Sequence, residues 1–254
     1  MRLAGKIAIV TGAAGAIGSS IARRFAQEGA DICLAARRGA PDLAAEIRSM
    51  GRRAIDIRTD VTIKAENEAM VAGCIAELGR VDILVTVAGV VSQGSAEDLA
   101  EEEWDRVMAV NLKGVFLSCQ AVIKPMRAQK SGRIINIGSL LAKNGGNPRP
   151  WINREDQKRG GNVAYGSAKA GVHAITLYLA KELAADNVTV NAVAPGPIGS
   201  PMTTNLPPAT LQMIPMGRIG LPDDVADACA YLAGNQAGWV TGEILDVNGG
   251  VWID

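Results

Sequence analysis

Two side chains that can exchange a proton stand four residues apart in the segment Tyr165-Gly166-Ser167-Ala168-Lys169. On an α-helix this spacing places a phenol and an ammonium on one face, one turn apart. A nearby cation favours the phenolate and lowers the pKa of a tyrosine below its ordinary value of about 10. We therefore interpret Tyr165 as a candidate acid or base. The alternative is an ordinary helix with both side chains in solvent.

A glycine-rich turn near the N-terminus indicates where a nucleotide binds. Residues 6–11 form a short apolar run typical of a buried parallel strand, and residues 19–26 have the apolar spacing of a helix. The turn between them reads Thr11-Gly12-Ala13-Ala14-Gly15-Ala16-Ile17-Gly18. Glycines let the backbone approach a pyrophosphate, and free N–H groups at the helix start bind the anion. The spacing differs from G-x-G-x-x-G, so an ordinary loop is the alternative.

Together these motifs resemble the short-chain dehydrogenase/reductase family, in particular its carbonyl and 3-oxoacyl reductases. The resemblance runs from about residue 5 to the C-terminus. It implies a catalytic set made of Asn111, Ser139, Tyr165 and Lys169. It also implies that the cofactor contacts the following residues, together with Tyr165 and Lys169: Gly12, Gly15, Ala16, Ile17, Gly18, Asp60, Val61, Ala88, Gly89, Pro195, Gly196 and Ile198.

The family's chemistry gives each catalytic residue an expected role. Tyr165 would be the acid in carbonyl reduction and the base in alcohol oxidation, and Ser139 would hold the substrate oxygen. Lys169 would lower the pKa of Tyr165 and bind the nicotinamide ribose, while Asn111 would support a water leading to solvent. His173, the single histidine, is interpreted as structural or interfacial, so no metal site is expected.

The end of the second expected strand bears on the choice of cofactor. An enzyme that prefers NAD usually has an acidic residue where Ala36 stands, because a carboxylate binds the ribose 2′-hydroxyl and repels a 2′-phosphate. Arg37 and Arg38 follow, and guanidinium groups bind phosphate through paired donors. We therefore expect NADP(H) to be favoured over NAD(H). The alternative is a solvated charge pair ahead of a helix.

Two departures from the family pattern concern the surroundings of the site. The family's Asn-Asn-Ala-Gly reads Thr86-Val87-Ala88-Gly89 here. Ser139 and Tyr165 lie 26 residues apart, which is longer than usual in the family. We expect the extra length, at about 140–162, to be a substrate loop containing Trp151, or else a solvent loop or subunit contact. Its basic residues Arg149, Arg154, Lys158 and Arg159 outnumber the acidic Glu155 and Asp156, which suits an anionic substrate. Residues 197–216 resemble the family's mobile flap.

Strand-like and helical patterns alternate along the 254 residues. This alternation predicts an α/β fold, a Rossmann-type doubly wound sheet of seven mainly parallel strands flanked by helices, in a single domain from 1 to 254. Residues at the carboxyl ends of the strands should then meet in one crevice. The expected strands are residues 6–11, 31–36, 54–60, 82–87, 133–137, 188–193 and 244–247, and helices are expected at 40–50, 63–78, 104–129 and 165–185.

Charge and cysteine usage limit the expected partners. Lys plus Arg and Asp plus Glu each number 26, and a net charge of zero argues against a nucleic-acid partner. Four dispersed cysteines and the lack of a visible targeting segment or membrane-spanning stretch favour a cytoplasmic protein without membrane contact. The family resemblance implies a homotetramer that pairs helices 104–129 and 165–185, with 244–254 as a further contact.

The most consistent function is an NADP(H)-dependent oxidoreductase that interconverts a small-molecule carbonyl and a secondary alcohol. Two alternatives remain: a redox sensor or regulator that binds the nucleotide without turnover, and a same-fold epimerase or dehydratase. A sensor need not keep Ser139, Tyr165 and Lys169 together. The short chain and the Pro195-Gly196 turn favour a simple reductase over the second alternative.

Overall fold

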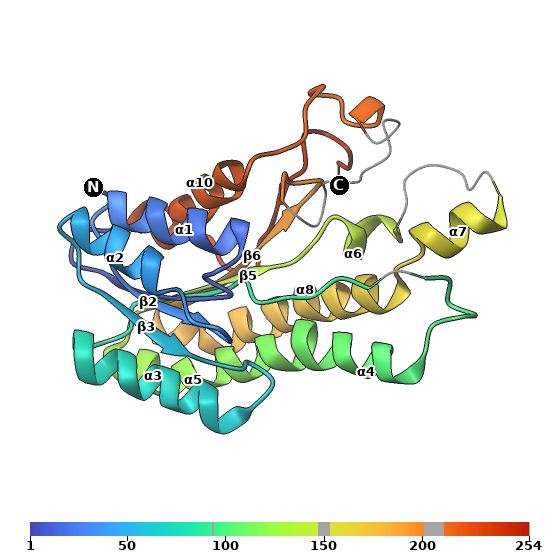
Figure 1. The fold of residues 1–254 in the computed structure, drawn as a ribbon. Helices are drawn as coiled ribbons and strands as arrows, with labels where there is room; N and C mark the ends of the chain where they lie inside the picture. The colour runs from blue at the N-terminus through green and yellow to red at the C-terminus, as the bar shows by residue number, and fades with distance from the viewer. Residues whose placement is uncertain (93, 147–152, 201–210, 254) are drawn as a thin grey trace.

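Seven strands form one sheet in the computed structural model, which describes residues 1–92, 94–146, 153–200 and 211–253. The strand order is β3-β2-β1-β4-β5-β6-β7, and every neighbouring pair is parallel (Figure 1). The predicted fold class is therefore confirmed. The strands are β1 (Ile7–Thr11), β2 (Asp31–Ala36), β3 (Ala54–Arg58), β4 (Ile83–Thr86), β5 (Gly132–Ile137), β6 (Val188–Pro195) and β7 (Ile244–Val247).

Helices cover both faces of the sheet, which explains why its central strands are continuous apolar runs. One face carries α1 (Ala16–Gln27), α2 (Pro41–Ser49) and α10 (Pro222–Ala233). The other carries α3 (Lys64–Leu78), α5 (Gly114–Gln129) and α8 (Val163–Leu183). Short 3-10 turns, η2 (Ala184–Asp186) and η4 (Asn235–Ala237), follow α8 and α10.

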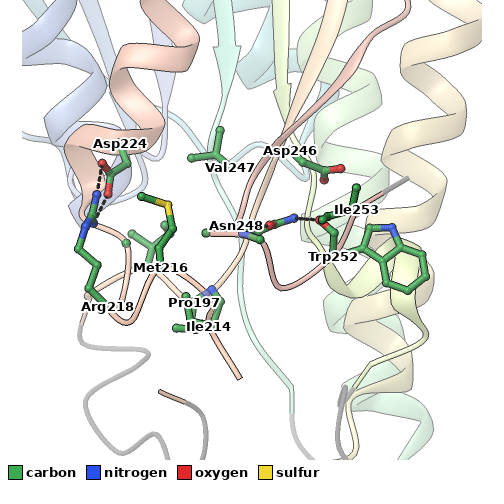
Figure 2. Close-up of a pocket in the computed structure, with 14 residues that line it drawn as sticks. Pro197, Ile214, Met216, Arg218, Asp224, Asp246, Val247, Asn248, Trp252 and Ile253 are labelled. Carbon is green, nitrogen blue, oxygen red and sulfur yellow. Dashed lines mark hydrogen bonds and ion pairs between the residues drawn. The ribbon is translucent and has the colours of Figure 1, made fainter. Parts of the chain in front are cut away.

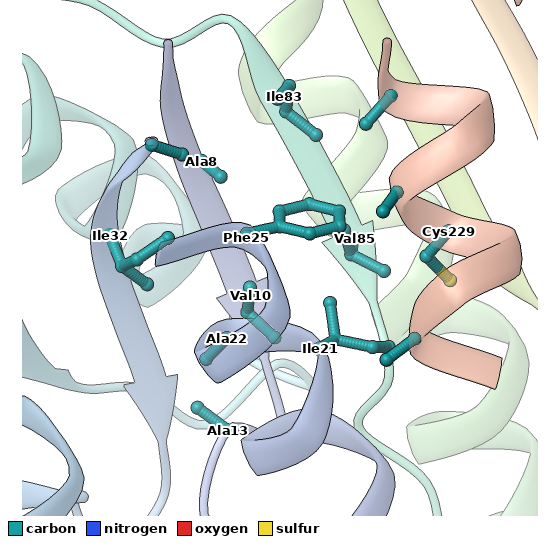
Figure 3. Packing of buried hydrophobic residues seen from close by; sticks show 14 of the residues in the cluster. Ala8, Val10, Ala13, Ile21, Ala22, Phe25, Ile32, Ile83, Val85 and Cys229 are labelled. Atoms are coloured by element: carbon teal, nitrogen blue, oxygen red, sulfur yellow. The ribbon is translucent and has the colours of Figure 1, made fainter. Parts of the chain in front are cut away.

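The hydrophobic core is divided by the sheet into two layers. Alternate residues of β1 serve opposite layers, because successive side chains of a strand point to opposite faces. Ala8 and Val10 pack in the layer under α1 and α10, whereas Ile9 packs under α3, α5 and α8. Figure 3 shows Phe25 of α1 beside Ile83 and Val85 of β4, with Cys229 of α10 in the same cluster. This packing holds α1 against the sheet face that β1 and β4 share.

One helix is longer than expected. It begins as α4 (Glu101–Met108), continues through a π-helical turn, η1 (Ala109–Lys113), and runs on as α5. By length and composition this 29-residue helix could cross a membrane, contrary to our expectation that no stretch reaches that length. Its α5 half, however, is packed against the sheet through Val115, Cys119 and Val122. Burial in the core accounts for its apolar composition.

The insertion between Ser139 and Tyr165 contains helices where a loop was expected. The segment α6 (Leu141–Asn144) follows Ser139 directly, and α7 (Arg154–Gly160) precedes α8. Our expectations for Arg149 and Trp151 fall outside the described residues, as do those for residues 201–210 of the flap. The end of the insertion is joined to the segment after β4 by a bridge between Gly94 and Asn162.

Candidate active site

The glycine turn after β1 packs directly against the turn after β4. The Thr11 hydroxyl accepts hydrogen bonds from the backbone N–H groups of Val87 at 3.0 Å and Ala88 at 3.3 Å. A Cβ atom at Gly12 would lie 2.7 Å from the Ala88 nitrogen, so no larger residue fits there. Gly12 also has a φ of +64°, which glycine adopts without strain. The two turns are thus in direct contact and form one continuous surface at the carboxyl ends of β1 and β4.

The start of α1 is open to an anion. Its cap residue is Gly15, which has no side chain that could accept a hydrogen bond from the first amides, and the first turn contains no acidic residue. The first intrahelical bond runs from Ser19 to Gly15, so the amides of residues 16–18 have no partner within the helix. A Cβ at Gly18 would lie 2.3 Å from the Gly12 carbonyl oxygen. This geometry fits a dinucleotide pyrophosphate.

Three arginines surround the end of β2 and, within the described part of the chain, make no hydrogen bond or ion pair. Arg37 and Arg38 are exposed just beyond Ala36, and Arg58 on β3 is exposed beside Ala36 in strand register. Every other arginine whose side chain is described makes a hydrogen bond or an ion pair with the protein. The sequence indicated the first two but not Arg58, because strand pairing brings it there.

Asp60 and Val61 lie at the end of β3, beyond the arginines. The Asp60 Oδ1 atom accepts hydrogen bonds from the Thr62 hydroxyl at 2.7 Å and the Thr62 N–H at 3.0 Å. These bonds, with a smaller contribution from the charge of Arg37, lower the pKa of Asp60. The carboxylate is therefore ionised at neutral pH. Val61 is buried beside it.

Helix α8 brings Tyr165 and Lys169 to the end of β5. The Lys169 Nζ atom is buried, donates to the Ile137 carbonyl oxygen at 2.6 Å, and lies 5.8 Å from the centroid of the Tyr165 ring. Burial lowers the pKa of Lys169 to about 8. The expected one-face arrangement of phenol and ammonium is present in the structure.

The pKa of Tyr165 is shifted in the direction opposite to our expectation. Burial raises the pKa of the Tyr165 phenol, and a hydrogen bond with Ser139 acts weakly against that rise. The Lys169 ammonium does not offset the burial, because it is directed at the Ile137 carbonyl. Ser139 is buried, and its hydroxyl also accepts the Leu141 N–H at 3.1 Å. Tyr165 is therefore protonated at neutral pH in this state.

Asn111 secures the turn next to Lys169. Its Oδ1 atom accepts the Val90 N–H at 2.8 Å, and its Nδ2 atom donates to the Val90 carbonyl at 2.8 Å. A Cβ at Gly89 would lie 3.3 Å from Asn111 Oδ1 and 3.9 Å from Lys169 Nζ. The Asn111 side chain thus holds residues 89–90 beside the lysine, and its own polar groups are engaged by backbone.

The Thr86 departure is accommodated by a buried polar chain. The Thr86 hydroxyl donates to Asn136 Oδ1 at 2.8 Å, and Asn136 Nδ2 donates to the Thr176 hydroxyl at 3.0 Å. Thr176 in turn donates to the Val172 carbonyl at 2.9 Å. The chain runs from β4 through β5 to α8, so threonine at position 86 helps to tie the catalytic helix to the sheet.

The Pro195-Gly196 turn joins the serine segment to the last strand. The Pro195 carbonyl accepts the Leu140 N–H at 3.0 Å, and the Gly196 N–H donates to the Val247 carbonyl at 3.0 Å. Beyond it, a cavity of about 560 Å³ lies between residues 197–198 and 214–220 on one side and the C-terminal turn on the other (Figure 2). Ile198, Met216 and Trp252 line this cavity, but the catalytic set does not. The cavity is therefore adjacent to the site and not the site itself.

The insertion is docked on the segment that follows β4. Arg154 of α7 pairs with Glu97, Lys158 Nζ lies 3.9 Å from Asp98 Oδ2, and the Gly94 N–H donates to the Gly161 carbonyl at 2.9 Å. Two of the basic residues that suggested an anionic substrate are thus matched by acids of the neighbouring segment. The expected charge surplus is compensated at Arg154 and Lys158.

Two relationships near Ser139 were not indicated by the sequence. Lys143 Nζ lies 2.8 Å from Asp246 Oδ2 and 3.3 Å from the Ile244 carbonyl oxygen, which ties α6 to β7. His173 Nε2 accepts the Ser139 backbone N–H at 3.4 Å. The sequence offers no signal for the first pair, which is far apart in the chain. The four-residue spacing of Lys169 and His173, which places them on one face of the helix, could have suggested the second.

A glycine turn suited to a dinucleotide, near Tyr165 and the buried Ser139 and Lys169, is the arrangement typical of one class of protein, an oxidoreductase that works with a nicotinamide cofactor. Residues 12–252 match the sequence profile of a family described as enoyl-(acyl carrier protein) reductase. The chain belongs to the short-chain dehydrogenase/reductase family, and it interconverts a carbonyl and a secondary alcohol.

Several characterised proteins are similar over nearly their whole length. The 3-oxoacyl-[acyl-carrier-protein] reductase FabG of Thermotoga maritima is 37% identical, with all of both chains covered. The (2S)-[(R)-hydroxy(phenyl)methyl]succinyl-CoA dehydrogenase subunit BbsD of Thauera aromatica is 39% identical, with 98% of each chain covered. The crystal structure of gox2181 has a TM-score of 0.88 and 35% identity, covering 99% of this chain and 98% of that chain.

Proposed function

We propose that Tyr165 is the acid and base of the reaction and that Ser139 holds the substrate oxygen. The observation that carries this proposal is the Tyr165–Ser139 hydrogen bond next to a buried lysine. In carbonyl reduction the phenol gives its proton to the oxygen, and in alcohol oxidation the phenolate takes a proton back. The bound nicotinamide supplies or accepts the hydride. Asn111 keeps the neighbouring turn in place.

The raised pKa of Tyr165 suits the reductive direction. A protonated phenol is the required acid, and burial keeps it protonated at neutral pH. For oxidation the phenolate must form, and positive charge on Lys169 and on an oxidised nicotinamide would favour it. Lys169 directs one N–H to Ile137, leaving two donors for the ribose hydroxyls.

We further propose that the cofactor is NADP(H). The support is the set of three unpartnered arginines, Arg37, Arg38 and Arg58, around a site where Ala36 supplies no carboxylate. Guanidinium groups without protein acceptors are suited to a 2′-phosphate. The Gly12, Gly15 and Gly18 turn would bind the pyrophosphate, and Asp60 with Val61 would contact the adenine. Ala88, Gly89, Pro195, Gly196 and Ile198 would line the nicotinamide end.

The cofactor proposal is tested by comparing dissociation constants for NADPH and NADH. Arg37→Ala and Arg58→Ala should each weaken NADPH by about 1–3 kcal/mol and leave NADH nearly unchanged. Lys181→Ala is the matched control, because Lys181 is also an exposed cation without an ion pair among the described residues, but lies near the far end of α8 from Tyr165. Equal affinity of the wild type for the two cofactors would overturn the assignment.

The reaction itself is tested by a panel of carbonyl compounds followed through the absorbance of the reduced nicotinamide. Because the named relatives include acyl thioester enzymes, the panel contains acetoacetyl-coenzyme A besides cyclic and small aliphatic ketones. Tyr165→Phe should abolish turnover while keeping NADPH affinity. Binding of NADPH without reduction of any carbonyl would favour the sensor over the enzyme.

We propose a cytoplasmic homotetramer built from one domain per chain. An open apolar groove lies between the long helix and α8, lined by Met108, Leu112, Phe116, Gly171 and Ile175 among others. Leu177 and Tyr178 of α8 are also exposed. A second copy of the same helices would cover both features, since closed symmetric assembly is common in soluble enzymes. The four cysteines are free and buried, which suits a reducing compartment.

A further inference from the structure

Helix α8 binds the backbone on both sides of Gly138, the residue before Ser139. Lys169 Nζ donates to the Ile137 carbonyl at 2.6 Å, and His173 Nε2 accepts the Ser139 N–H at 3.4 Å. We propose that His173 is a positioning residue that fixes Ser139 for the reaction. This inference goes beyond the catalytic set and rests on the proposed role of Ser139.

The imidazole is seated edge-on against the glycine backbone. A Cβ atom at Gly138 would lie 2.2 Å from His173 Nε2 and 2.7 Å from its Cδ2 atom. Non-bonded atoms in folded proteins do not approach each other so closely, so this position of the imidazole requires glycine at position 138. Because Nε2 accepts this hydrogen bond, that nitrogen carries no proton, and the imidazole has its proton on Nδ1. Size and hydrogen bonding therefore both match His173 to this position.

The backbone N–H groups of Gly138 and Leu140 have acceptors on β6, and His173 supplies the acceptor for the N–H group of Ser139. The Gly138 N–H donates to the Val193 carbonyl at 2.8 Å, and the Leu140 N–H donates to the Pro195 carbonyl at 3.0 Å. Both bonds run towards β6. Ser139 is buried, and within the described parts of the chain the bond to His173 is the one that its N–H makes. Without the imidazole this amide would lose its acceptor.

The consequence for catalysis follows from the Ser139 side chain. Its hydroxyl bonds with Tyr165 and must present the substrate oxygen to the phenol at a fixed angle. A peptide group free to rotate between residues 138 and 140 would move that hydroxyl. The contacts of His173 given above are with the serine segment, so the cofactor site should be unaffected. The expected loss is in kcat, by about 10- to 100-fold.

The first experiment compares His173→Leu with His173→Gln in the full-length enzyme. With NADPH and the ketone that the wild type reduces fastest, His173→Leu should lower kcat about 10- to 100-fold at unchanged NADPH affinity. His173→Gln, whose side-chain carbonyl can accept the Ser139 N–H, should recover most of the activity. Thermal unfolding of each variant separates a positioning effect from loss of the fold. Wild-type kcat in His173→Leu would overturn the proposal.

The second experiment uses the close approach at Gly138. Gly138→Ala should displace the imidazole and reduce kcat as His173→Ala does. The double variant Gly138→Ala/His173→Ala should be no less active than His173→Ala, because the new methyl group then has room. Losses that multiply in the double variant would overturn the proposal. Ser139→Ala separates the proposal for His173 from the proposal for Ser139. If Ser139→Ala keeps wild-type kcat, the proposed role of Ser139 is itself wrong.

Discussion

The Lys169 ammonium lies 2.6 Å from the carbonyl oxygen of Ile137, and among the described residues no carboxylate forms an ion pair with it. A buried charge with a carbonyl as its partner is unfavourable, because the carbonyl does not replace the lost hydration fully. Burial accordingly lowers the pKa of Lys169 from the ordinary 10.5 to about 8. The residue proposed to bind the ribose therefore weakens the fold.

Replacing this lysine by methionine should stabilise the protein and remove its activity. The unfolded chain keeps the lysine proton up to pH 10.5 and the folded chain releases it near pH 8, so the penalty is full below pH 8. At roughly 1.4 kcal/mol per pKa unit, Lys169→Met should raise the free energy of unfolding at pH 7 by roughly 3 kcal/mol. The gain should shrink as the pH rises from 8 to 10.5. Urea unfolding at several pH values tests this, and a variant less stable than the wild type at pH 7 would contradict it.

Introducing an acid at the end of β2 should reverse the cofactor preference. In Ala36→Asp the new carboxylate would lie among Arg37, Arg38 and Arg58 and compete with a 2′-phosphate for them. We expect NADPH affinity to fall by about 1–3 kcal/mol and NADH affinity to stay the same or improve. Fluorescence titration with both cofactors measures this. An equal loss for the two would mean that the substitution only distorts the strand.

A methyl group at Gly18 should damage the cofactor site. The added Cβ would lie 2.3 Å from the Gly12 carbonyl oxygen and 2.9 Å from the Gly12 carbonyl carbon, which are backbone atoms, so the turn must shift. Gly18→Ala should cost about 1–3 kcal/mol of stability and weaken both NADPH and NADH. Thermal unfolding and cofactor titration are the measurements. Unchanged affinity for both cofactors would show that the turn has room that the structure does not indicate.

Releasing α7 from its acidic partners should affect the substrate and not the cofactor. The ion pairs of Arg154 with Glu97 and of Lys158 with Asp98 are largely exposed, so each is worth at most about 1 kcal/mol. Glu97→Gln/Asp98→Asn should therefore raise KM for the substrate several-fold, with NADPH affinity unchanged. High salt should reproduce the effect in the wild type. Glu102→Gln, an exposed acid outside these pairs, is the control. A changed NADPH affinity would mean that the insertion supports the nucleotide site.

Charge on the exposed face of α8 should dissociate the assembly. Leu177 is 47% exposed and Tyr178 is 79% exposed, which is unfavourable for apolar and aromatic side chains in a monomer. Leu177→Glu should reduce the mass found by light scattering, whereas Glu68→Gln on α3, an exposed position outside the two helices proposed to pair, should not. A wild-type protein that is already monomeric at micromolar concentration would contradict the tetramer.

The sheet and the place of the site could be predicted because they depend on local patterns. Buried parallel strands are continuous apolar runs, and the observed bounds of β1 to β7 differ from the expected ones by two residues or fewer. Residues at the carboxyl ends of parallel strands must meet at one edge. Thr11, Ala88 and Ser139 do so.

The remaining features depend on contacts between distant parts of the chain. Helix α7 is highly polar, so its sequence alone resembles a loop. Its ion pairs are with Glu97 and Asp98, which lie far away in the sequence. The direction of the Tyr165 pKa shift depends on burial, which the spacing of Tyr165 and Lys169 does not reveal. Arg58 becomes a candidate phosphate ligand only through the pairing of β2 with β3.

The π-helical turn from Ala109 to Lys113 restricts how this region of the chain can change in evolution. Each residue of a helix rotates the side chains by about 100°, and a π turn contains more residues than a regular one. Its presence lets Val107 pack against Ala164 and Ala168 of α8 while Val115 packs against the sheet. Deleting one residue there would regularise the hydrogen bonds but turn one half of the helix away from its neighbour. Apart from Asn111, whose side chain holds the turn beside Lys169, positions in this segment should accept substitutions more readily than changes in length.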